Sequence, residues 1–127
     1  MTTQERRNYE VEAKIQVEDL DAVRVRLETV GGRLVGNWQE TDWFFDCDDQ
    51  RLKGADSALR LRERTDLHTL QSVHRLTFKG PRLPGKFKIR REVEITVDDP
   101  GRVKTLLEML GLVPWISCRK LRSSYLC

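Results

Sequence analysis

The sequence predicts a single α+β domain in which an antiparallel sheet curls toward a partial barrel and two helices cover it. Three observations support this fold class: several segments alternate apolar and polar residues, two segments have helical spacing with clear caps, and a strand–helix unit recurs. A length of 127 residues fits one domain, and 39% hydrophobic residues can supply its core.

The strands are predicted from period-two alternation. Residues 9–17 place Tyr9, Val11 and Ala13 on one face and the intervening polar residues on the other. Segments 58–64 and 75–80 alternate leucine or phenylalanine with arginine, lysine or threonine and are expected to pair as a hairpin. Further strands are expected at 35–46, 87–97 and 115–126, with loops at 48–57 and 80–86.

Two helices are predicted at residues 19–30 and 99–110. Asp19 caps the first and Gly31 ends it, whereas Asp99 caps the second, with Pro100 at its first position and Gly111 as terminator. Each helix has apolar residues at three- and four-residue spacing. We expect both apolar stripes to pack on the outside of the sheet.

The two strand–helix segments align on each other with an offset of 80 residues. Residues 9–31 and 89–111 share identical residues at 8 of 23 positions, which indicates an internal duplication, although shared helix patterning is an alternative explanation. If the duplication is real, counterparts of the 58–64 and 75–80 strands would fall near positions 138–144 and 155–160. Residues 1–127 are therefore predicted to be one domain that is incomplete at its C-terminal side.

Composition excludes several classes of protein. The 23 basic and 20 acidic residues leave a net charge of +3, too small for a histone-like protein. The sequence has no apolar run long enough to span a membrane, and its polar start does not resemble a signal peptide, so we expect a cytoplasmic protein without a membrane partner. The three cysteines lack zinc or disulfide-framework spacing.

One face of the predicted sheet is almost entirely charged. A solvated outer face explains any single alternating strand, but four such strands favour an inward face that holds a charged ligand. The residues on this face are Glu10, Glu12, Lys14, Arg60, Arg62, Arg64, Arg75, Lys79, Lys88, Arg90, Glu92 and Glu94.

The residue types on this face suit a metal-bound polyphosphate. The carboxylates of Glu10 and Glu12 share a face about 7 Å apart at the backbone, close enough to ligate a hard divalent cation such as Mg²⁺. Arg60 and Arg62 have the same spacing, and their planar guanidinium groups suit bidentate phosphate contacts. The sequence has no P-loop, so side chains would have to grip the phosphates.

The order of several motifs resembles the CYTH superfamily of triphosphate tunnel metalloenzymes. The resemblance begins at Glu10-Val11-Glu12-Ala13-Lys14 and covers nearly the whole chain. It continues through Gln39-x-x-Asp42-Trp43-Phe44-Phe45-Asp46, Leu59-Arg60-Leu61-Arg62, Leu76-Thr77-Phe78-Lys79-Gly80-Pro81, Arg90-x-Glu92-x-Glu94 and Lys120-x-Arg122-x-x-Tyr125.

The resemblance implies a triphosphate-tunnel β-barrel and an enzyme that depends on Mg²⁺ or Mn²⁺. The implied reaction is either class IV adenylate cyclase chemistry, from ATP to cyclic AMP and pyrophosphate, or hydrolysis of ATP, thiamine triphosphate or tripolyphosphate. The implied catalytic residues are Lys14, Arg60 and Arg62. Those three would also bind the substrate, together with Lys79, Arg90, Lys120 and Arg122. The implied metal ligands are Glu10, Glu12, Glu92 and Glu94.

The sequence departs from the family at its end, because the family continues with strands that bear an Asp and a second Glu-x-Glu pair. We therefore expect this chain alone to bind triphosphate weakly and to turn it over little. Two alternatives stay open: a non-catalytic module that binds phosphate, a nucleotide or RNA, and an inactive shortened remnant. The four carboxylates make a nucleic-acid partner unlikely on charge grounds, and a homodimer whose half-sheets complete each other is a further possibility.

Overall fold

The computed structural model describes residues 9–12, 19–85 and 87–126 of the chain. Its elements follow one another in the order β1 (Tyr9–Glu12), α2 (Leu20–Thr29), β2 (Arg33–Asp46), α3 (Arg51–Gly54), β3 (Ala58–Asp66), β4 (Ser72–Leu83), β5 (Lys88–Val97), α4 (Pro100–Met109) and β6 (Val113–Leu126).

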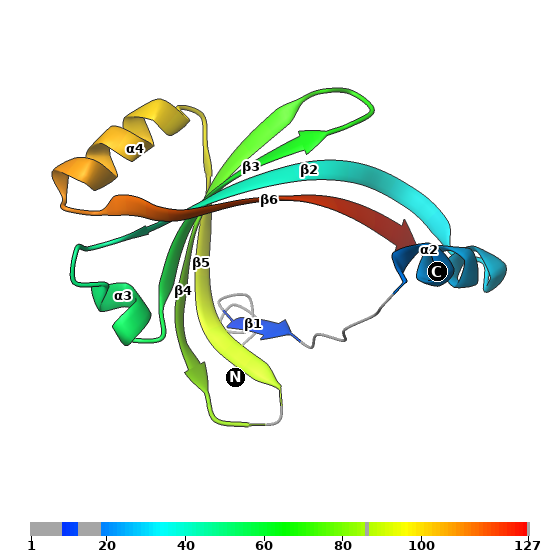
Figure 1. Ribbon diagram of the computed structural model, residues 1–127, viewed down its shortest axis with the longest axis horizontal. Coiled ribbons are helices and arrows are strands. Elements are labelled where there is room, and N and C mark those ends of the chain that lie inside the picture. The colour runs from blue at the N-terminus through cyan, green and yellow to red at the C-terminus, as the bar shows by residue number, and fades with distance from the viewer. Residues whose placement is uncertain (1–8, 13–18, 86, 127) are drawn as a thin grey trace.

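All six strands belong to one antiparallel sheet with the order β1-β5-β4-β3-β2-β6. Figure 1 shows its strong twist, with β2 and β6 arching away from the long β4–β5 pair. Among the described residues, β1 pairs with β5 alone and β6 with β2 alone, so the sheet is not closed. The α+β class and the curled antiparallel sheet agree with the sequence prediction. No helix in the described residues is long and apolar enough to cross a membrane.

Two predicted loops contain regular structure. Strand β4 continues to Leu83, because a register shift between Lys79 and Arg82 accommodates Pro81, which has no N–H for the ladder. In the other segment a short helix, α3, forms beside Asp46. The buried Asp46 carboxylate accepts backbone hydrogen bonds from Cys47, Leu52 and Lys53 at 2.7–3.0 Å, and these bonds hold the turn.

The hydrophobic core lies between the sheet and α4. Phe45, Leu59, Leu61 and Leu107 form it, and α4 supplies only Leu107 as a buried residue. Figure 1 shows α4 on one side of the sheet, as predicted for residues 99–110. The prediction that residues 19–30 also pack on the sheet is wrong, because α2 has no buried residue.

The repeat predicted from the sequence recurs in the element bounds. Both α2 and α4, and likewise β2 and β6, are related by the same offset of 80 residues. Gly31 and Gly111 end the two helices in left-handed conformations, with φ of 89° and 85°. Each strand pair also crosses at equivalent positions, because Glu10 faces Arg90 in β1–β5 and Glu40 faces Lys120 in β2–β6. The two units are therefore related by a local pseudo-twofold arrangement.

Candidate functional site

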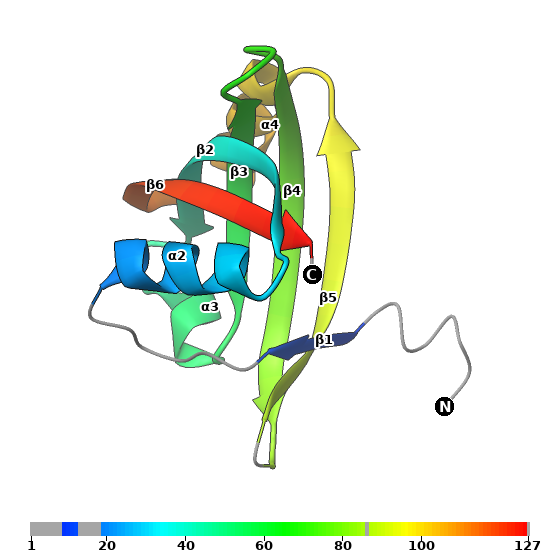
Figure 2. The same cartoon turned by 90° about the vertical axis from the view of Figure 1, so that its right-hand side faces the viewer.

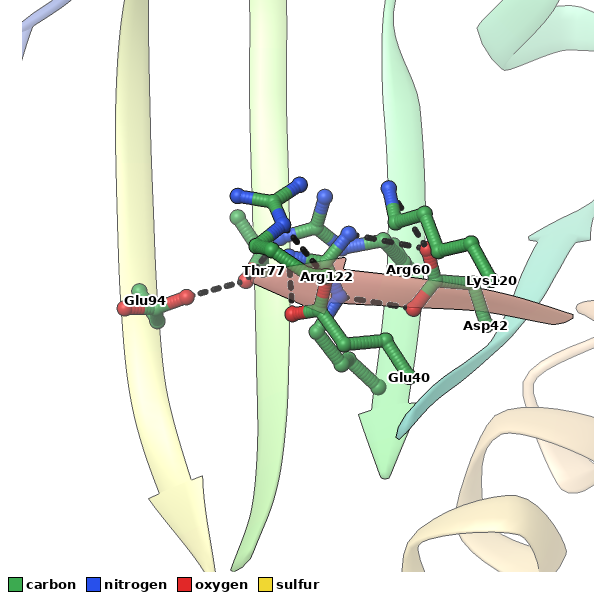
Figure 3. Close-up of polar contacts among 8 residues, drawn as sticks. Glu40, Asp42, Arg60, Thr77, Glu94, Lys120 and Arg122 are labelled. Carbon is green, nitrogen blue, oxygen red and sulfur yellow. Dashed lines mark hydrogen bonds and ion pairs between the residues drawn. The ribbon is translucent and has the colours of Figure 1, made fainter. Parts of the chain in front are cut away.

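The strand register gathers charged side chains on one face of the sheet. Arg60 of β3 lies opposite Thr77 of β4, which lies opposite Glu94 of β5. On the other side of β3, Arg62 lies opposite Asp42 of β2. Because residues directly opposite one another share a face, these side chains and those of Glu40, Lys120 and Arg122 meet in one layer. Figure 3 shows seven of them together: Glu40, Asp42, Arg60, Thr77, Glu94, Lys120 and Arg122.

Two buried carboxylates organise this layer. Asp42 receives a bidentate pair from Arg62, with Nε–Oδ1 at 2.7 Å and Nη2–Oδ2 at 2.9 Å. Glu40 contacts the same guanidinium at 3.1 Å and the Nε of Arg122 at 3.0 Å. Lys120 reaches Asp42 at 3.8 Å. The side chains of Asp42 and Glu40 are each 2% exposed, so their charges are compensated almost wholly by these cations.

This pairing shifts the ionisation of both partners of the central ion pair. Burial alone would raise the pKa of Asp42, but the hydrogen bonds and charge of Arg62 outweigh it and lower that pKa below its ordinary value. Burial alone would lower the pKa of Arg62, and Asp42 reverses that effect and raises it. The Asp42–Arg62 pair is therefore a fixed charged unit at neutral pH.

Arg60 differs from Arg62 in its surroundings. Burial, followed by repulsion from Arg62, lowers the pKa of Arg60 relative to an ordinary guanidinium. Its Nη2 approaches the Thr77 hydroxyl at 3.5 Å, and that hydroxyl donates to Glu94 at 2.9 Å (Figure 3). The Nε of Arg60 is buried and has no hydrogen-bond partner among the described residues. Arg60 is thus a desolvated cation whose Nε–H donor has no acceptor among the described residues.

Two further arginines also have a buried Nε without an acceptor among the residues that the structure describes. The Nε atoms of Arg64 on β3 and Arg90 on β5 are also buried without a hydrogen-bond partner in the described part of the chain. Buried donors without an acceptor are costly, and native proteins satisfy most of them. Three guanidinium donors on this face are therefore buried without an acceptor in the described residues, and an anion would satisfy them only if the side chains shift toward it.

Asp56 positions Arg90 at one end of this face. Its carboxylate accepts from the backbone N–H and the Nε of Arg82, at 2.9 and 3.0 Å, and lies 3.4 Å from a terminal nitrogen of Arg90. The same nitrogen of Arg90 donates to the Asp56 carbonyl at 3.1 Å. These hydrogen bonds from Arg82, and the charges of both arginines, lower the pKa of Asp56 against a small burial effect.

The structure places most of the site residues predicted from the sequence on this one face. Arg60, Arg62, Lys120 and Arg122 come together around Glu40 and Asp42. Lys79 lies opposite Glu92 in the β4–β5 register. Lys14 lies outside the described residues, as do the side chains of Glu10 and Glu12, although β1 sets their backbone opposite Arg90 and Lys88.

The structure describes the side chains of two of the four predicted metal ligands, Glu92 and Glu94. The carboxylate of Glu94 accepts from Thr77, and Glu92 lies two residues before it on the same face. Among the described side chains, no group of three His, Cys, Asp or Glu residues could hold a metal ion. The backbone of β1 runs beside β5, which brings the Glu10 and Glu12 positions to the strand that bears Glu92.

Sequence analysis missed the roles of Glu40, Thr77 and Asp56. Glu40 and Asp42 alternate on β2 with the same spacing as Arg60 and Arg62 on β3. That spacing could have indicated that both carboxylates lie on the charged face. Their pairing was not readable, because it depends on the β2–β3 register. Asp56 lies in a segment predicted to be a loop, and its contacts with Arg82 and Arg90 span 26 and 34 residues.

A family model for the CYTH domain matches residues 8–127 of this chain. The chain belongs to the CYTH domain family. A protein of Methanocaldococcus jannaschii named "Putative adenylate cyclase MJ0240" is 27% identical to it over 116 residues, which is 91% of this chain and 63% of that protein.

Two solved structures have the fold of this CYTH domain. The PH1819 protein of Pyrococcus horikoshii matches with a TM-score of 0.76 at 23% identity, over 86% of this chain and 60% of that one. A structure from Vibrio parahaemolyticus titled a putative adenylate cyclase matches with a TM-score of 0.69 at 22% identity, over 87% and 58%. The chain thus spans about three fifths of the length of these relatives.

Proposed function

We propose that this CYTH domain forms the cationic part of a metal-dependent enzyme that acts on a triphosphate. The observation behind the proposal is the set of three buried guanidinium donors, on Arg60, Arg64 and Arg90, that have no protein acceptor in the described residues. A polyphosphate has oxygen acceptors along its length and negative charge to match several cations. A neutral ligand would add no negative charge beside Arg60, whose charged form burial and Arg62 already disfavour.

The arginines of β3 would have different roles in this enzyme. Arg60 would bind a phosphate directly, because burial and Arg62 disfavour its charge and its Nε has no acceptor in the described residues. All three nitrogens of the Arg62 guanidinium already contact Asp42 or Glu40. Arg62 would therefore contribute fewer hydrogen bonds to a phosphate and would mainly hold the side chains of β2 and β3 in place. Lys120 and Arg122 are about half exposed and can reorient toward phosphate oxygens.

The remaining predicted contacts complete the proposed site. Lys79 and Arg90 would bind phosphate from β4 and β5, and Lys14 would add a third catalytic cation beside Arg60 and Arg62. Glu10, Glu12, Glu92 and Glu94 would supply oxygen ligands to Mg²⁺ or Mn²⁺. The bound metal would neutralise phosphate charge and align the oxygens for in-line displacement.

Two reactions fit this arrangement. In a class IV adenylate cyclase, the ribose 3′-oxygen of ATP attacks the α-phosphorus, pyrophosphate leaves and the hydroxyl proton is lost to solvent. In a triphosphate phosphohydrolase, water attacks the terminal phosphorus and the shorter phosphate chain leaves. In both reactions the arginines of β3 would stabilise the charge that develops on the leaving phosphate. The relative named "Putative adenylate cyclase MJ0240" favours the first reaction.

The test is a panel of ATP, thiamine triphosphate and tripolyphosphate, each with Mg²⁺, Mn²⁺ or a chelator. Binding is followed by calorimetry and products by phosphorus NMR. We expect metal-dependent binding of at least one compound. Turnover by this chain should be weak, because the face of the sheet that bears Arg60 and Arg62 is open on the side of β6. Absence of metal-dependent binding for all three would overturn the proposal.

A single-stranded RNA arm separates the competing binding-module function. That function predicts binding that is unchanged by chelation and falls steeply with salt, because many phosphates are neutralised at once. The proposed enzyme predicts that RNA binds more weakly than the metal–triphosphate complex at the same ionic strength.

A further inference from the structure

We propose that a cavity beside Trp38 and Arg64 is the subsite for the nucleobase of a nucleoside triphosphate. The inference rests on the proposed function and adds the part of the substrate that is not phosphate. The cavity has a volume of about 290 Å³. Besides Trp38 and Arg64, its walls include Asp66, Gln71 and Arg75.

The Trp38 ring and the Arg64 guanidinium group form a stacking surface in the cavity. The guanidinium carbon of Arg64 lies 4.0 Å from the centroid of the Trp38 ring. A planar heteroaromatic ring can extend this stack, since bases stack both on indole rings and on guanidinium planes. The Nε of Arg64 is buried, so a base would meet this guanidinium through its stacking face and not through that donor. Gln71 adds an amide that can donate and accept.

The cavity begins where the phosphate-binding layer ends. Trp38 precedes Glu40 by two residues on the same face of β2, and Arg64 follows Arg62 by two residues on β3. Two residues along a strand span about 7 Å, so a ligand can occupy both places at once. Arg75 bridges them, because it lines the cavity and lies opposite Arg62 in the β3–β4 register.

The cavity is large enough for a nucleobase but too small for a whole nucleotide. Sites for drug-sized ligands have volumes of roughly 300–1,000 Å³. This cavity lies at the lower limit of that range, so it suits one ring system with the sugar and phosphates outside it. The phosphates would then lie over Arg62 and Arg60, and of these Arg60 has a buried Nε without an acceptor in the described residues.

Charge distinguishes a neutral base from a cationic ring. The cavity has two guanidinium groups, on Arg64 and Arg75, against one carboxylate, on Asp66. That carboxylate already accepts from the backbone N–H groups of His68 and Thr69, at 2.8 and 3.2 Å. A thiazolium ring, which is positively charged, would meet excess positive charge here. The site therefore favours ATP or another nucleoside triphosphate over thiamine triphosphate.

A second cavity, beside Trp115 at the opposite end of β3, is a poorer match. It has a volume of about 240 Å³, and its walls include the carboxylate-bearing residues Asp46 and Asp56. Its walls also include two cations, Lys53 and Arg90, which balance these two carboxylates, and Arg90 is already paired with Asp56 at 3.4 Å. This cavity therefore has no excess of positive charge toward a triphosphate. Trp115 therefore offers a matched control for Trp38, since its ring is also near a cation, Lys53, at 5.2 Å.

The experiment measures binding of ATP, thiamine triphosphate and tripolyphosphate to the whole chain by calorimetry with Mg²⁺, for the parent protein and the Trp38→Ala, Trp38→Phe and Trp115→Ala variants. We expect Trp38→Ala to weaken ATP binding about tenfold, consistent with loss of one base–aromatic stack. Trp38→Phe should recover most of that loss, and Trp115→Ala should change ATP binding less than twofold. Tripolyphosphate binding should change less than twofold in every variant. Urea unfolding establishes that each variant is folded.

The outcomes separate the two proposals. If tripolyphosphate does not bind the parent protein in a metal-dependent way, the proposed function fails. If tripolyphosphate binds but Trp38→Ala leaves ATP affinity unchanged, the nucleobase subsite is wrong while the proposed function stands. If Trp38→Ala weakens thiamine triphosphate as much as ATP, the site does not select a neutral base and that part of the inference is overturned.

Discussion

The two strand–helix–strand units have the same caps but differ in how their helices are buried. Asp19 and Asp99 both accept hydrogen bonds from backbone N–H groups of the first helical turn, at 3.0–3.1 Å. In the second unit Leu107 is 5% exposed and packs into the core. Its counterpart Leu27, 80 residues earlier, lies on a helix with no buried residue.

The difference shows that an apolar stripe needs a partner surface from elsewhere in the chain. Helix α4 finds one in Phe45 of β2 and in Leu59 and Leu61 of β3. Helix α2 lies near the start of β2 and the end of β6 (Figure 2). Among the described residues, the second unit has no counterpart of the β3–β4 hairpin on which α2 could pack.

The units also divide the charges of the site. At the two crossing points of the pseudo-twofold arrangement, the first unit contributes an acid and the second a base: Glu10 opposite Arg90, and Glu40 opposite Lys120. The hairpin then adds Arg62, which compensates Glu40 and Asp42 of the first unit. We therefore expect removal of Arg62 to destabilise the fold more than removal of a base of the second unit.

The largest effect is expected for Arg62→Met. It leaves two carboxylates buried with only half-exposed cations nearby, which costs about 3–5 kcal/mol of unfolding free energy. Lys120→Met is the matched control and should cost less than about 1 kcal/mol, because Lys120 is 41% exposed and its contact with Asp42 is 3.8 Å long. Urea unfolding at pH 7 measures both, and equal losses would contradict the assigned division of charge.

The next effect compares the helices directly. Leu107→Ala should destabilise the domain by about 2–5 kcal/mol, because a buried leucine leaves a cavity. Leu27→Ala should cost less than about 1 kcal/mol, because Leu27 is half-buried on a helix that has no buried residue. Both values come from urea titrations, and a cost above 2 kcal/mol for Leu27→Ala would show that α2 packs in solution.

The helix caps give a smaller version of the same comparison. Asp99→Ala removes the acceptor of the hydrogen bond that the backbone N–H of Arg102 donates, and it should cost about 1 kcal/mol of global stability. Asp19→Ala removes equivalent bonds to Asp21 and Ala22. It should lower helical circular dichroism without moving the urea midpoint, because α2 is not coupled to the core. A matching shift of the midpoint in both variants would show that the helices are equally coupled.

The smallest effect is expected in the pH dependence of Asp56, which holds Arg90 of the second unit. Its folded pKa is lower than the ordinary value of about 3.8, so its contribution to stability is present above that pH and is lost as pH falls through the folded pKa. Asp56→Asn should therefore show less loss of stability on acidification below pH 4 than the parent protein. Asp49→Asn, on an exposed carboxylate, is the control, and indistinguishable curves for the parent and Asp56→Asn would contradict the assignment.

Sequence analysis was most successful where a local pattern determines structure. The caps at Asp19 and Asp99, the terminating glycines and the strand alternation around Arg60 all depend on nearest neighbours in the chain, and each recurs in the structure. It failed for the packing of residues 19–30, because burial depends on a partner surface. It also missed the role of Glu40, because strand register, and not composition, brings Glu40 to Arg62 and Arg122.

Calorimetric titration of tripolyphosphate with Mg²⁺ into the parent protein, Arg60→Met and Arg102→Met shows whether this face of the sheet binds triphosphate. Arg60 is the desolvated cation with an unused donor, whereas Arg102 lies on α4 and is 90% exposed. The account predicts that Arg60→Met weakens binding by about 1.5–3 kcal/mol, or roughly 10- to 150-fold, the value of a charged hydrogen bond, and that Arg102→Met changes it less than twofold. Equal affinity of the two variants, with both folded at the urea midpoint of the parent, would contradict the claim that this face of the sheet binds triphosphate.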